Sequence, residues 1–237
     1  MNERILGVLG GMGPLASAHF MVRLTELTPA ARDQEHIRAV LWSDPTIPDR
    51  SSHRLANGAD PLPALLRGLS GLKAAGCGAV AIPCNTAHGW YEEMLAAGLP
   101  ILHIVDASAV ELRKAQPAGT VGVMGTAATL AMRLYQDRLE TRGWRVIVPG
   151  DEVMRTLVMP AISLVKAGRV AEAFAPLAEA ARGLVRRGAG AVVLGCTEIP
   201  LGMKAGPAGE IGVPLIDTID ALALAAIAWA RGEDAAA

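Results

Sequence analysis

The sequence predicts an α/β protein made of two similar lobes, each with a central parallel sheet and related by pseudo-two-fold symmetry. Two short apolar runs, residues 78–82 and 190–194, are bounded by turn residues, which is typical of buried strands in a parallel sheet. Landmarks also recur after 112 to 115 positions, as Gly7 and Gly122, Cys84 and Cys196, and Pro100 and Pro214 do. This period is too long for a solenoid and fits two lobes. The alternative, that α/β strands look alike because they end in glycine, stays open.

The repeat also predicts the domain boundaries. Residues 1–105 form the first lobe and residues 106–212 the second, and the segment 213–237 is expected to pack back on the first lobe. Equivalent loops of two lobes related by such symmetry meet at their interface, where we expect the active site.

The first lobe begins with a strand that enters a glycine-rich turn and a helix. Asp60 is expected to cap a helix with Pro61 at its first position, and that helix is expected to stop at Gly76. The segment from Ser43 to Arg50, which holds two prolines and two aspartates, is expected to be an ordered loop. The expected strands are 4–9, 37–42, 78–82 and 100–106 with its turn, and the expected helices are 15–27, 61–75 and 107–115.

The second lobe repeats this order. Apolar runs predict strands 121–124, 144–148, 190–194 and 214–218, and helical periodicity predicts helices 153–166 and 171–187 and an Ala-rich helix that ends near residue 230.

Composition excludes several classes of function. The net charge of −1 and an aromatic content of 3% give no basis for a nucleic-acid partner or an anionic membrane partner. The N-terminus lacks the features of a signal peptide and no run of eighteen apolar residues exists, so we expect a cytoplasmic protein. Three cysteines without metal spacing indicate thiols rather than a disulfide framework or a metal site.

The turn Gly10-Gly11-Met12-Gly13-Pro14 allows close approach of a ligand to the main chain. Amides of the next helix can bind an anion such as a carboxylate. The spacing is not that of a dinucleotide loop, and a tight turn without a ligand is the alternative. Farther on, Arg50 offers a fork to a substrate carboxylate or pairs with Asp49 or Asp44.

Cys84 and Cys196 each follow the carboxyl end of a strand, where open α/β sheets place their ligand crevices. A helix beginning beyond Cys84 would lower the pKa of its thiol. His88 is either a catalytic group or a capping and packing residue. Cys77, between two glycines, is expected to be a small buried residue without chemistry.

Two thiols in equivalent places indicate proton transfer at one carbon from both faces. Removing the α-hydrogen of an amino acid and returning it to the other face needs two bases, one a thiolate and the other a thiol. The carbanion between them needs fixed donors for its carboxylate. Thr126 contacts the substrate or caps a helix, and Lys166 complements a helix dipole or reaches into the crevice.

Four motifs carry a resemblance over nearly the whole chain. Gly10-Gly11-Met12-Gly13-Pro14, Ile47-Pro48-Asp49-Arg50, Pro83-Cys84-Asn85-Thr86-Ala87-His88 and Gly195-Cys196-Thr197-Glu198-Ile199-Pro200-Leu201 resemble the aspartate/glutamate racemase family, in its aspartate racemase branch.

The resemblance implies a cofactor-independent amino-acid racemase with two α/β lobes, a site between them and a homodimeric assembly. It implies Cys84 and Cys196 as the acid/base pair, with no cofactor or metal. The substrate-binding residues expected on this basis are Met12, Arg50, Asn85, Thr86, Ala87, Thr126, Lys166 and Thr197, with His88 and Glu198 as tuning residues.

One position departs from the family pattern. Asp44 stands before the proline of the second-strand loop, where the family often has asparagine. A carboxylate near the site would disfavour an acidic side chain, so we expect a neutral, basic or mixed range of amino acids, provided that Asp44 does not point to solvent.

Other functions remain as alternatives. A hydantoin racemase, a maleate isomerase or a decarboxylase would use the same superfamily fold with different chemistry. A pyridoxal phosphate enzyme is disfavoured because none of the four lysines sits in a recognisable cofactor site. A binding protein for small acids would not explain two matched thiols.

Overall fold

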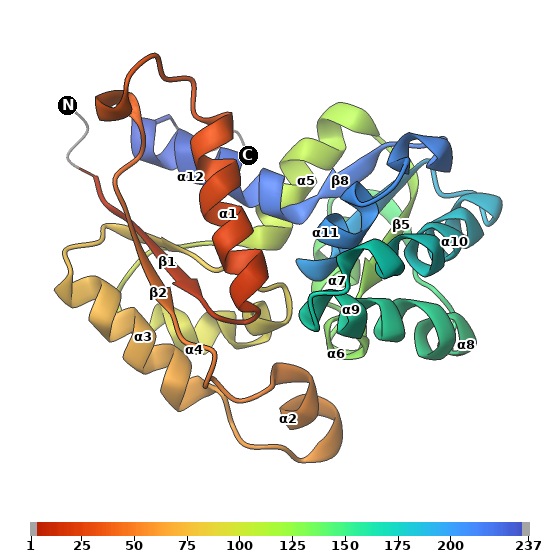
Figure 1. The fold of residues 1–237 in the computed structure, drawn as a ribbon, viewed down its shortest axis with the longest axis horizontal. Helices are drawn as coiled ribbons and strands as arrows, with labels where there is room; N and C mark the ends of the chain where they lie inside the picture. Colours follow the sequence, from red (N-terminus) through yellow and green to blue (C-terminus); the bar gives the residue numbers. More distant parts are fainter. Residues whose placement is uncertain (1–3, 234–237) are drawn as a thin grey trace. The chain divides into compact units, whose positions relative to one another are not determined.

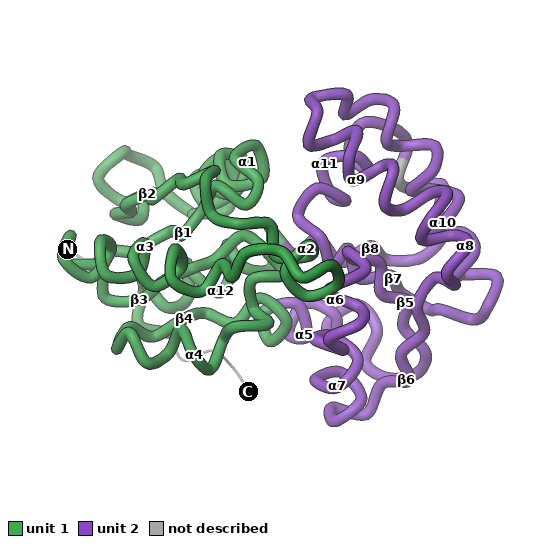
Figure 2. The backbone as a smooth tube through the Cα atoms, turned by 90° about the horizontal axis from the view of Figure 1, so that it is seen from below, with its two compact units in different colours: residues 1–107, 219–237 green, residues 108–218 purple. Residues whose placement is uncertain are grey.

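The computed structural model describes residues 4–233 and divides the chain into two compact units. The first unit comprises residues 1–107 and 219–237 and the second residues 108–218, as Figure 2 shows in green and purple. The ends of the first unit, 1–3 and 234–237, lie outside the described residues.

The first unit is built on a parallel sheet of four strands in the order β2-β1-β3-β4. Its strands are β1 (Leu6–Gly10), β2 (Ala39–Ser43), β3 (Ala79–Ala81) and β4 (Ile101–Leu102). Its helical elements are α1 (Pro14–Leu27), η1 (Asp33–Glu35), α2 (Arg50–Ala56), α3 (Leu62–Ala74), η2 (Thr86–Trp90), α4 (Tyr91–Leu95), the start of α5 (Ile104–Ala115) and nearly all of α12 (Thr218–Arg231).

Helices cover both faces of this sheet (Figure 1). Alternation along β2 turns Leu41 toward Ser17 of α1, since a Cβ on Gly10 would meet both side chains, and turns Trp42 toward the glycines of α3. Arg23 of α1 binds both carboxylate oxygens of Asp220 on α12, at 2.6 and 3.0 Å. This ion pair links the first and last helices of the unit.

The second unit repeats the arrangement with a parallel sheet in the order β6-β5-β7-β8. Its strands are β5 (Gly119–Gly125), β6 (Trp144–Ile147), β7 (Ala191–Gly195) and β8 (Leu215–Asp217). Its helical elements are the rest of α5, α6 (Ala127–Ala131), α7 (Leu134–Glu140), α8 (Asp151–Val153), the π-helix η3 (Met154–Val158), α9 (Met159–Lys166), η4 (Val170–Ala173), α10 (Phe174–Arg186), α11 (Glu198–Lys204) and η5 (Ala208–Ile211).

The two sheets have the same strand order, second-first-third-fourth, so β1 corresponds to β5 and β3 to β7. The expected α/β fold with two similar lobes is therefore confirmed. Each unit has an apolar core, around Leu9, Leu69 and Val80 in the first and around Ile162, Leu177 and Val192 in the second. Burying a side chain of this size stabilises a fold by about 1.5–3 kcal/mol.

The end of the chain differs in detail from the prediction. The segment from 213 was expected on the first lobe, but β8 pairs with β7 of the second sheet. Only from residue 219 does the chain belong to the first unit, with α12. β8 completes the sheet of the second unit, because parallel pairing with β7 satisfies its main-chain hydrogen-bonding groups.

Two helical segments also differ from their predictions. Residues 50–56 form α2 beyond the expected loop, because the Asp49 carboxylate accepts a hydrogen bond from the Ser52 amide at 2.7 Å and caps the helix. The expected helix 153–166 widens into a π-turn at 154–158. Pro160 follows this turn, and since it has no N–H the α-helical bond to Thr156 cannot form. Within residues 4–233, no helix combines the length and apolarity needed to cross a membrane.

Candidate active site

In the first unit, Cys84 lies just beyond β3 and is buried, with an exposed fraction of 5%. Its amide donates to the Ile82 carbonyl at 2.7 Å, which turns the chain sharply at the strand end. Asn85, Thr86 and Ala87 follow at the start of η2 and are buried as well. The expected group around Cys84 therefore forms one compact turn at the carboxyl edge of the sheet.

His88 is attached to main-chain groups on both sides of its ring. Nδ1 lies 3.0 Å from the Cys84 carbonyl oxygen, and Nε2 accepts a hydrogen bond from the Ile104 amide at 3.3 Å. The side chain is 2% exposed. These contacts correspond to the capping and packing role that the sequence left open.

The glycine-rich turn lies at the end of β1, the neighbour of β3. Gly11 has a φ of +92°, and a Cβ there would come within 2.4 Å of the Asp44 main chain. Ser17 holds the turn, since its hydroxyl accepts from the Gly11 amide at 2.9 Å and donates to the Gly13 carbonyl at 2.8 Å. Only glycine permits this approach of two loops.

Arg50, the first residue of α2, is brought to this turn and is buried. Its guanidinium donates to the carbonyls of Ile47 at 3.1 Å, Pro48 at 2.9 Å and Met12 at 3.4 Å. Nε is buried without a hydrogen-bond partner. Among the described residues Arg50 forms no ion pair, so the alternative of a pair with Asp49 or Asp44 is wrong.

Asp44 serves its own loop. Its Oδ1 accepts from the Thr46 amide at 2.9 Å and from the Thr46 hydroxyl at 2.6 Å. These two bonds are the main reason that the pKa of the Asp44 carboxyl is lowered, so the group is negatively charged at neutral pH. The side chain is partly exposed. Its effect on substrate choice stays a prediction.

In the second unit, Cys196 lies just beyond β7 and is 4% exposed. Its Sγ donates a hydrogen bond to Oε2 of Glu198 at 3.0 Å. The Thr197 hydroxyl donates to the same oxygen at 3.3 Å, and Glu198 is itself 4% exposed. Cysteine, threonine and glutamate thus form one buried cluster at the start of α11.

This cluster holds the Cys196 thiol in its protonated form. Burial first, and then the charge of Glu198 and its hydrogen bond, raise the pKa of Cys196 well above its ordinary value. The Glu198 amide and the charge of Lys166 act in the opposite direction but do not prevail. Lys166 is the exposed last residue of α9, which packs against α11. The positive charge of Lys166 therefore acts to lower the pKa of the Cys196 thiol.

Thr126 follows β5, the neighbour of β7, and Gly125 pairs in register with Gly195. Thr126 and Cys196 therefore each follow a residue of the same register pair on adjacent strands. The Thr126 hydroxyl accepts from the Thr129 amide at 3.1 Å and is hydrogen-bonded to the Thr129 hydroxyl at 2.9 Å. This is the helix-capping role.

The predicted residues thus form two groups at carboxyl edges of two sheets. The first unit brings together Met12, Arg50, Cys84, Asn85, Thr86, Ala87 and His88, and the second unit brings together Thr126, Lys166, Cys196, Thr197 and Glu198. That the two thiols face one substrate stays a prediction.

Ser17 and His103 belong to the site region although no sequence motif predicts a role for them. His103 is 7% exposed, and its Nδ1 accepts from the Val105 amide at 3.2 Å, which caps α5. The landmark that begins at Pro100 was a signal for it, because the matching landmark at Pro214 has Asp217 in the same place.

The three cysteines are free and buried, and burial raises the pKa of Cys77. In residues 4–233 no three His, Cys, Asp or Glu side chains gather as ligands for a metal ion.

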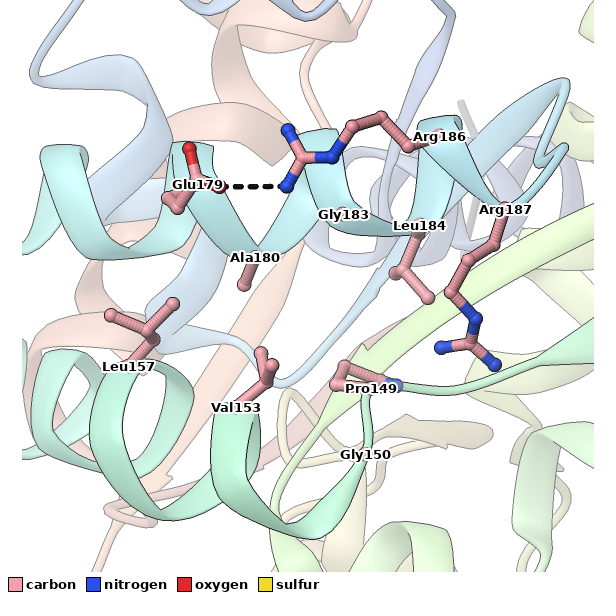
Figure 3. A pocket seen from close by; sticks show the side chains of 10 residues that line it. All are labelled: Pro149, Gly150, Val153, Leu157, Glu179, Ala180, Gly183, Leu184, Arg186 and Arg187. Atoms are coloured by element: carbon pink, nitrogen blue, oxygen red, sulfur yellow. Dashed lines mark hydrogen bonds and ion pairs between the residues drawn. The ribbon is translucent and has the colours of Figure 1, made fainter.

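A hollow of about 100 Å³ lies in the second unit, away from the predicted residues (Figure 3). Val153 and Leu157 on one side and Ala180 and Leu184 of α10 on the other line it, and Arg186 at its rim is paired with Glu179 at 2.7 Å. It contains none of the residues predicted to bind substrate.

Comparison with known proteins identifies relatives. The sequence model of one family, described as Asp/Glu/hydantoin racemase, matches residues 9–226. The chain is 32% identical over 148 residues to the broad specificity amino-acid racemase RacX of Bacillus subtilis (strain 168), covering 60% of this chain and 63% of RacX. It is 28% identical over 126 residues to the glutamate racemase of Streptococcus equi subsp. equi (strain 4047), covering 52% of this chain and 46% of that protein. These matches span less than two thirds of either relative.

A solved structure is similar over nearly the whole chain. The aspartate racemase of Picrophilus torridus superposes with a TM-score of 0.85 at 32% identity, covering 97% of this chain and 94% of that chain. The resemblance drawn from the four motifs and the fold of two similar lobes are both confirmed.

Proposed function

This chain belongs to the Asp/Glu/hydantoin racemase family, and we propose that it is a cofactor-independent amino-acid racemase in which Cys84 and Cys196 are the acid/base pair. The expectation of an isomerase is confirmed at the level of the family. The observation that carries the proposal is the equivalence of the two thiols. Each follows the third strand of its sheet, in sheets with the same strand order.

The reaction is a transfer of one proton in and one proton out at Cα. A thiolate takes the α-hydrogen as a proton, so an S–H bond forms as the C–H bond breaks. The electron pair stays on a planar carbanion that delocalises into the carboxylate. The opposite thiol then delivers its proton to the other face and becomes the thiolate, so no oxidant or reductant is consumed.

Arg50 is the donor that we assign to the substrate carboxylate. Its cation is buried among three carbonyl oxygens and, within the described chain, has no carboxylate partner. A buried charge is costly unless an opposite charge compensates it. A substrate carboxylate supplies that charge, and the fixed guanidinium stabilises the negative charge that grows there during proton removal.

The surroundings of Cys196 support a direction for the resting enzyme. Its raised pKa makes it a thiol at neutral pH, so we assign it as the proton donor and Cys84 as the first base. After one turnover the roles are exchanged, and Glu198 then opposes the thiolate at Cys196. This asymmetry predicts different proton-exchange rates for the two enantiomers.

The substrate range is proposed to extend beyond acidic amino acids. The Asp44 main chain meets the glycine-rich turn, and we propose that its charged, partly exposed carboxylate disfavours a second negative charge nearby. The names of the relatives include both a broad specificity enzyme and an aspartate racemase.

We also propose that the protein is a homodimer. Light scattering coupled to size-exclusion chromatography measures the molar mass that tests this proposal.

The test is α-proton exchange in deuterated water, followed by NMR, on single enantiomers of acidic, neutral and basic amino acids. Wild type is compared with Cys84→Ala and Cys196→Ala, with Cys77→Ala as the matched control, and no cofactor is added. We expect exchange and formation of the enantiomer in wild type and in Cys77→Ala, and no racemisation in the other two variants. Absence of exchange with every amino acid would reject the proposal and direct the panel to hydantoins and dicarboxylic acids.

A further inference from the structure

Next to the Cys84 main chain in the first unit lie two buried histidines, His88 and His103, with the partly buried Tyr91 against them. The ring centroids of His88 and His103 are 4.8 Å apart, and those of Tyr91 and His103 are 4.6 Å apart. The Tyr91 hydroxyl donates to the Ile101 carbonyl at 3.4 Å. The cluster therefore connects the turn after β3, the end of β4 and the start of α5.

Both histidines serve the first turn of α5. The first amides of a helix have no partner inside it. Here the Ile104 amide donates to Nε2 of His88, and the Val105 amide donates to Nδ1 of His103. The Ala107 amide then donates to the His103 carbonyl at 3.0 Å and begins the regular helix.

These contacts determine where the protons of the two rings are. A main-chain N–H can only donate, so Nε2 of His88 and Nδ1 of His103 must both carry a free lone pair. The proton of neutral His88 is then on Nδ1, from which it donates to the Cys84 carbonyl. The proton of neutral His103 is on Nε2. A doubly protonated His88 would offer no acceptor to the Ile104 amide, and a doubly protonated His103 would offer none to the Val105 amide.

We propose that His88 is a positioning residue for Cys84: as a neutral imidazole with its proton on Nδ1, it ties the Cys84 main chain to the first turn of α5. Its catalytic consequence rests on the proposed function, because it acts by placing the Cys84 thiol. Protonation of His88 turns the bond with Ile104 into a clash of two donors and loosens this connection. The thiol then loses its fixed position.

The groups that face this pair decide its response to pH. Near the two imidazoles are the ring of Tyr91 and the carboxylate of Asp106, whose Oδ2 is 4.0 Å from Nδ1 of His103. Asp106 favours a positive charge on His103. Histidine ordinarily has a pKa of about 6.5, so the connection is expected to fail on the acidic side of neutrality.

Two substitutions separate the two hydrogen bonds of His88. The amide nitrogen of His88→Asn takes the place of Nδ1 and keeps the bond to Cys84, whereas the oxygen of His88→Gln takes the place of Nε2 and keeps the bond from Ile104. Neither titrates. His53→Asn is the matched control, because the His53 ring lies on α2 and its Nδ1 is 3.0 Å from the Gly58 carbonyl.

The first measurement is independent of activity. Nitrogen-15 NMR of the imidazole rings and of the Cys84 and Ile104 amides is recorded across a pH range of about 5 to 8, which brackets the ordinary histidine pKa. We expect neutral His88 with its proton on Nδ1 at the upper end of this range, and both amide signals to shift together as His88 titrates. A proton on Nε2, or an Ile104 amide that does not respond, overturns the proposal.

The second measurement is the pH profile of α-proton exchange. We expect kcat to fall on the order of ten- to a hundred-fold in His88→Ala with KM little changed, less in His88→Asn, and the acidic limb to disappear in both. His53→Asn keeps the wild-type profile. An unchanged acidic limb in His88→Asn overturns the proposal. If the rings titrate as expected but wild type exchanges no amino acid, the proposed function fails while the positioning of Cys84 stands.

Discussion

The thiol of Cys196 donates a hydrogen bond to the carboxylate of Glu198, with 3.0 Å between Sγ and Oε2 and both side chains buried. A carboxylate in this place favours the thiol over the thiolate, because two negative charges would otherwise lie side by side away from water. Burial raises the pKa of Cys196 most, and the charge and hydrogen bond of Glu198 raise it further, so both favour the protonated thiol.

Replacing Glu198 by glutamine removes the charge and keeps the size. We expect the pKa of Cys196 to fall, and each unit of that fall to raise the thiolate fraction near neutral pH about ten-fold. Thiolate absorbance against pH, with Cys77→Ala and Cys84→Ser in the background, reports Cys196 alone. Thr197→Val, which removes a neutral donor to the same carboxylate, is the control. If the pKa of Cys196 stays the same or rises in Glu198→Gln, the Glu198 carboxylate does not keep the Cys196 thiol protonated.

The same pair predicts how stability depends on pH. The folded-state pKa of Cys196 is raised, so the unfolded thiol loses its proton first, near its ordinary pKa of about 8.5. The contribution to the free energy of unfolding is fully present below that value. It is lost at up to about 1.4 kcal/mol per pH unit as pH rises toward the folded pKa. Urea unfolding from neutral pH to about pH 10, which spans the ordinary thiol pKa, should show a shallower decline in Cys196→Ser than in wild type, and equal slopes would contradict this.

Arg50 is predicted to bind the substrate carboxylate through the planar geometry of its guanidinium as well as through its charge. Arg50→Lys keeps a cation but not the planar donors that match a carboxylate. We expect kcat/KM to fall about ten- to a hundred-fold, as for loss of a charged hydrogen bond worth about 1.5–3 kcal/mol. Arg38→Lys, at an exposed arginine, is the control. Equal kinetics in the two variants would remove Arg50 from the substrate site.

Asp44→Asn tests the origin of substrate preference. Asparagine keeps the oxygen that accepts from the Thr46 amide and hydroxyl, so the melting temperature should change little. We expect the ratio of kcat/KM for acidic over neutral amino acids to rise, because the repelling charge is gone. A constant ratio would mean that Asp44 only holds its loop.

Gly11→Ala tests the close approach of two loops. Gly11 has a φ of +92° and a Cβ there meets the Asp44 main chain at 2.4 Å, whereas Gly76 has a φ of +80° with nothing within 4 Å. Gly76→Ala therefore reports backbone strain alone, of order 1 kcal/mol. We expect a clearly larger loss of unfolding free energy in Gly11→Ala. Equal losses would show that the two loops part easily.

Some of the site could be read from local patterns. Cys84 and Cys196 were predicted at strand ends because apolar runs between turn residues identify buried strands. The equal strand order of the two sheets then confirmed the repeat that their spacing indicated. Local patterns did not predict the π-turn at residues 154–158. Apolar periodicity indicates a helix there, but it does not show that Pro160 removes an α-helical hydrogen bond and that the turn before it widens.

The sequence by itself determined the fold class, the two cysteine motifs and the family, because hydrophobic periodicity and short motifs are properties of neighbouring residues. Only the tertiary structure decided the surroundings of each group. It placed Arg50 among the carbonyls of Met12, Ile47 and Pro48 and joined His88 to Ile104. It also gave Cys196 a raised pKa. Burial and charge depend on which distant segments pack together, and a linear pattern does not contain that information.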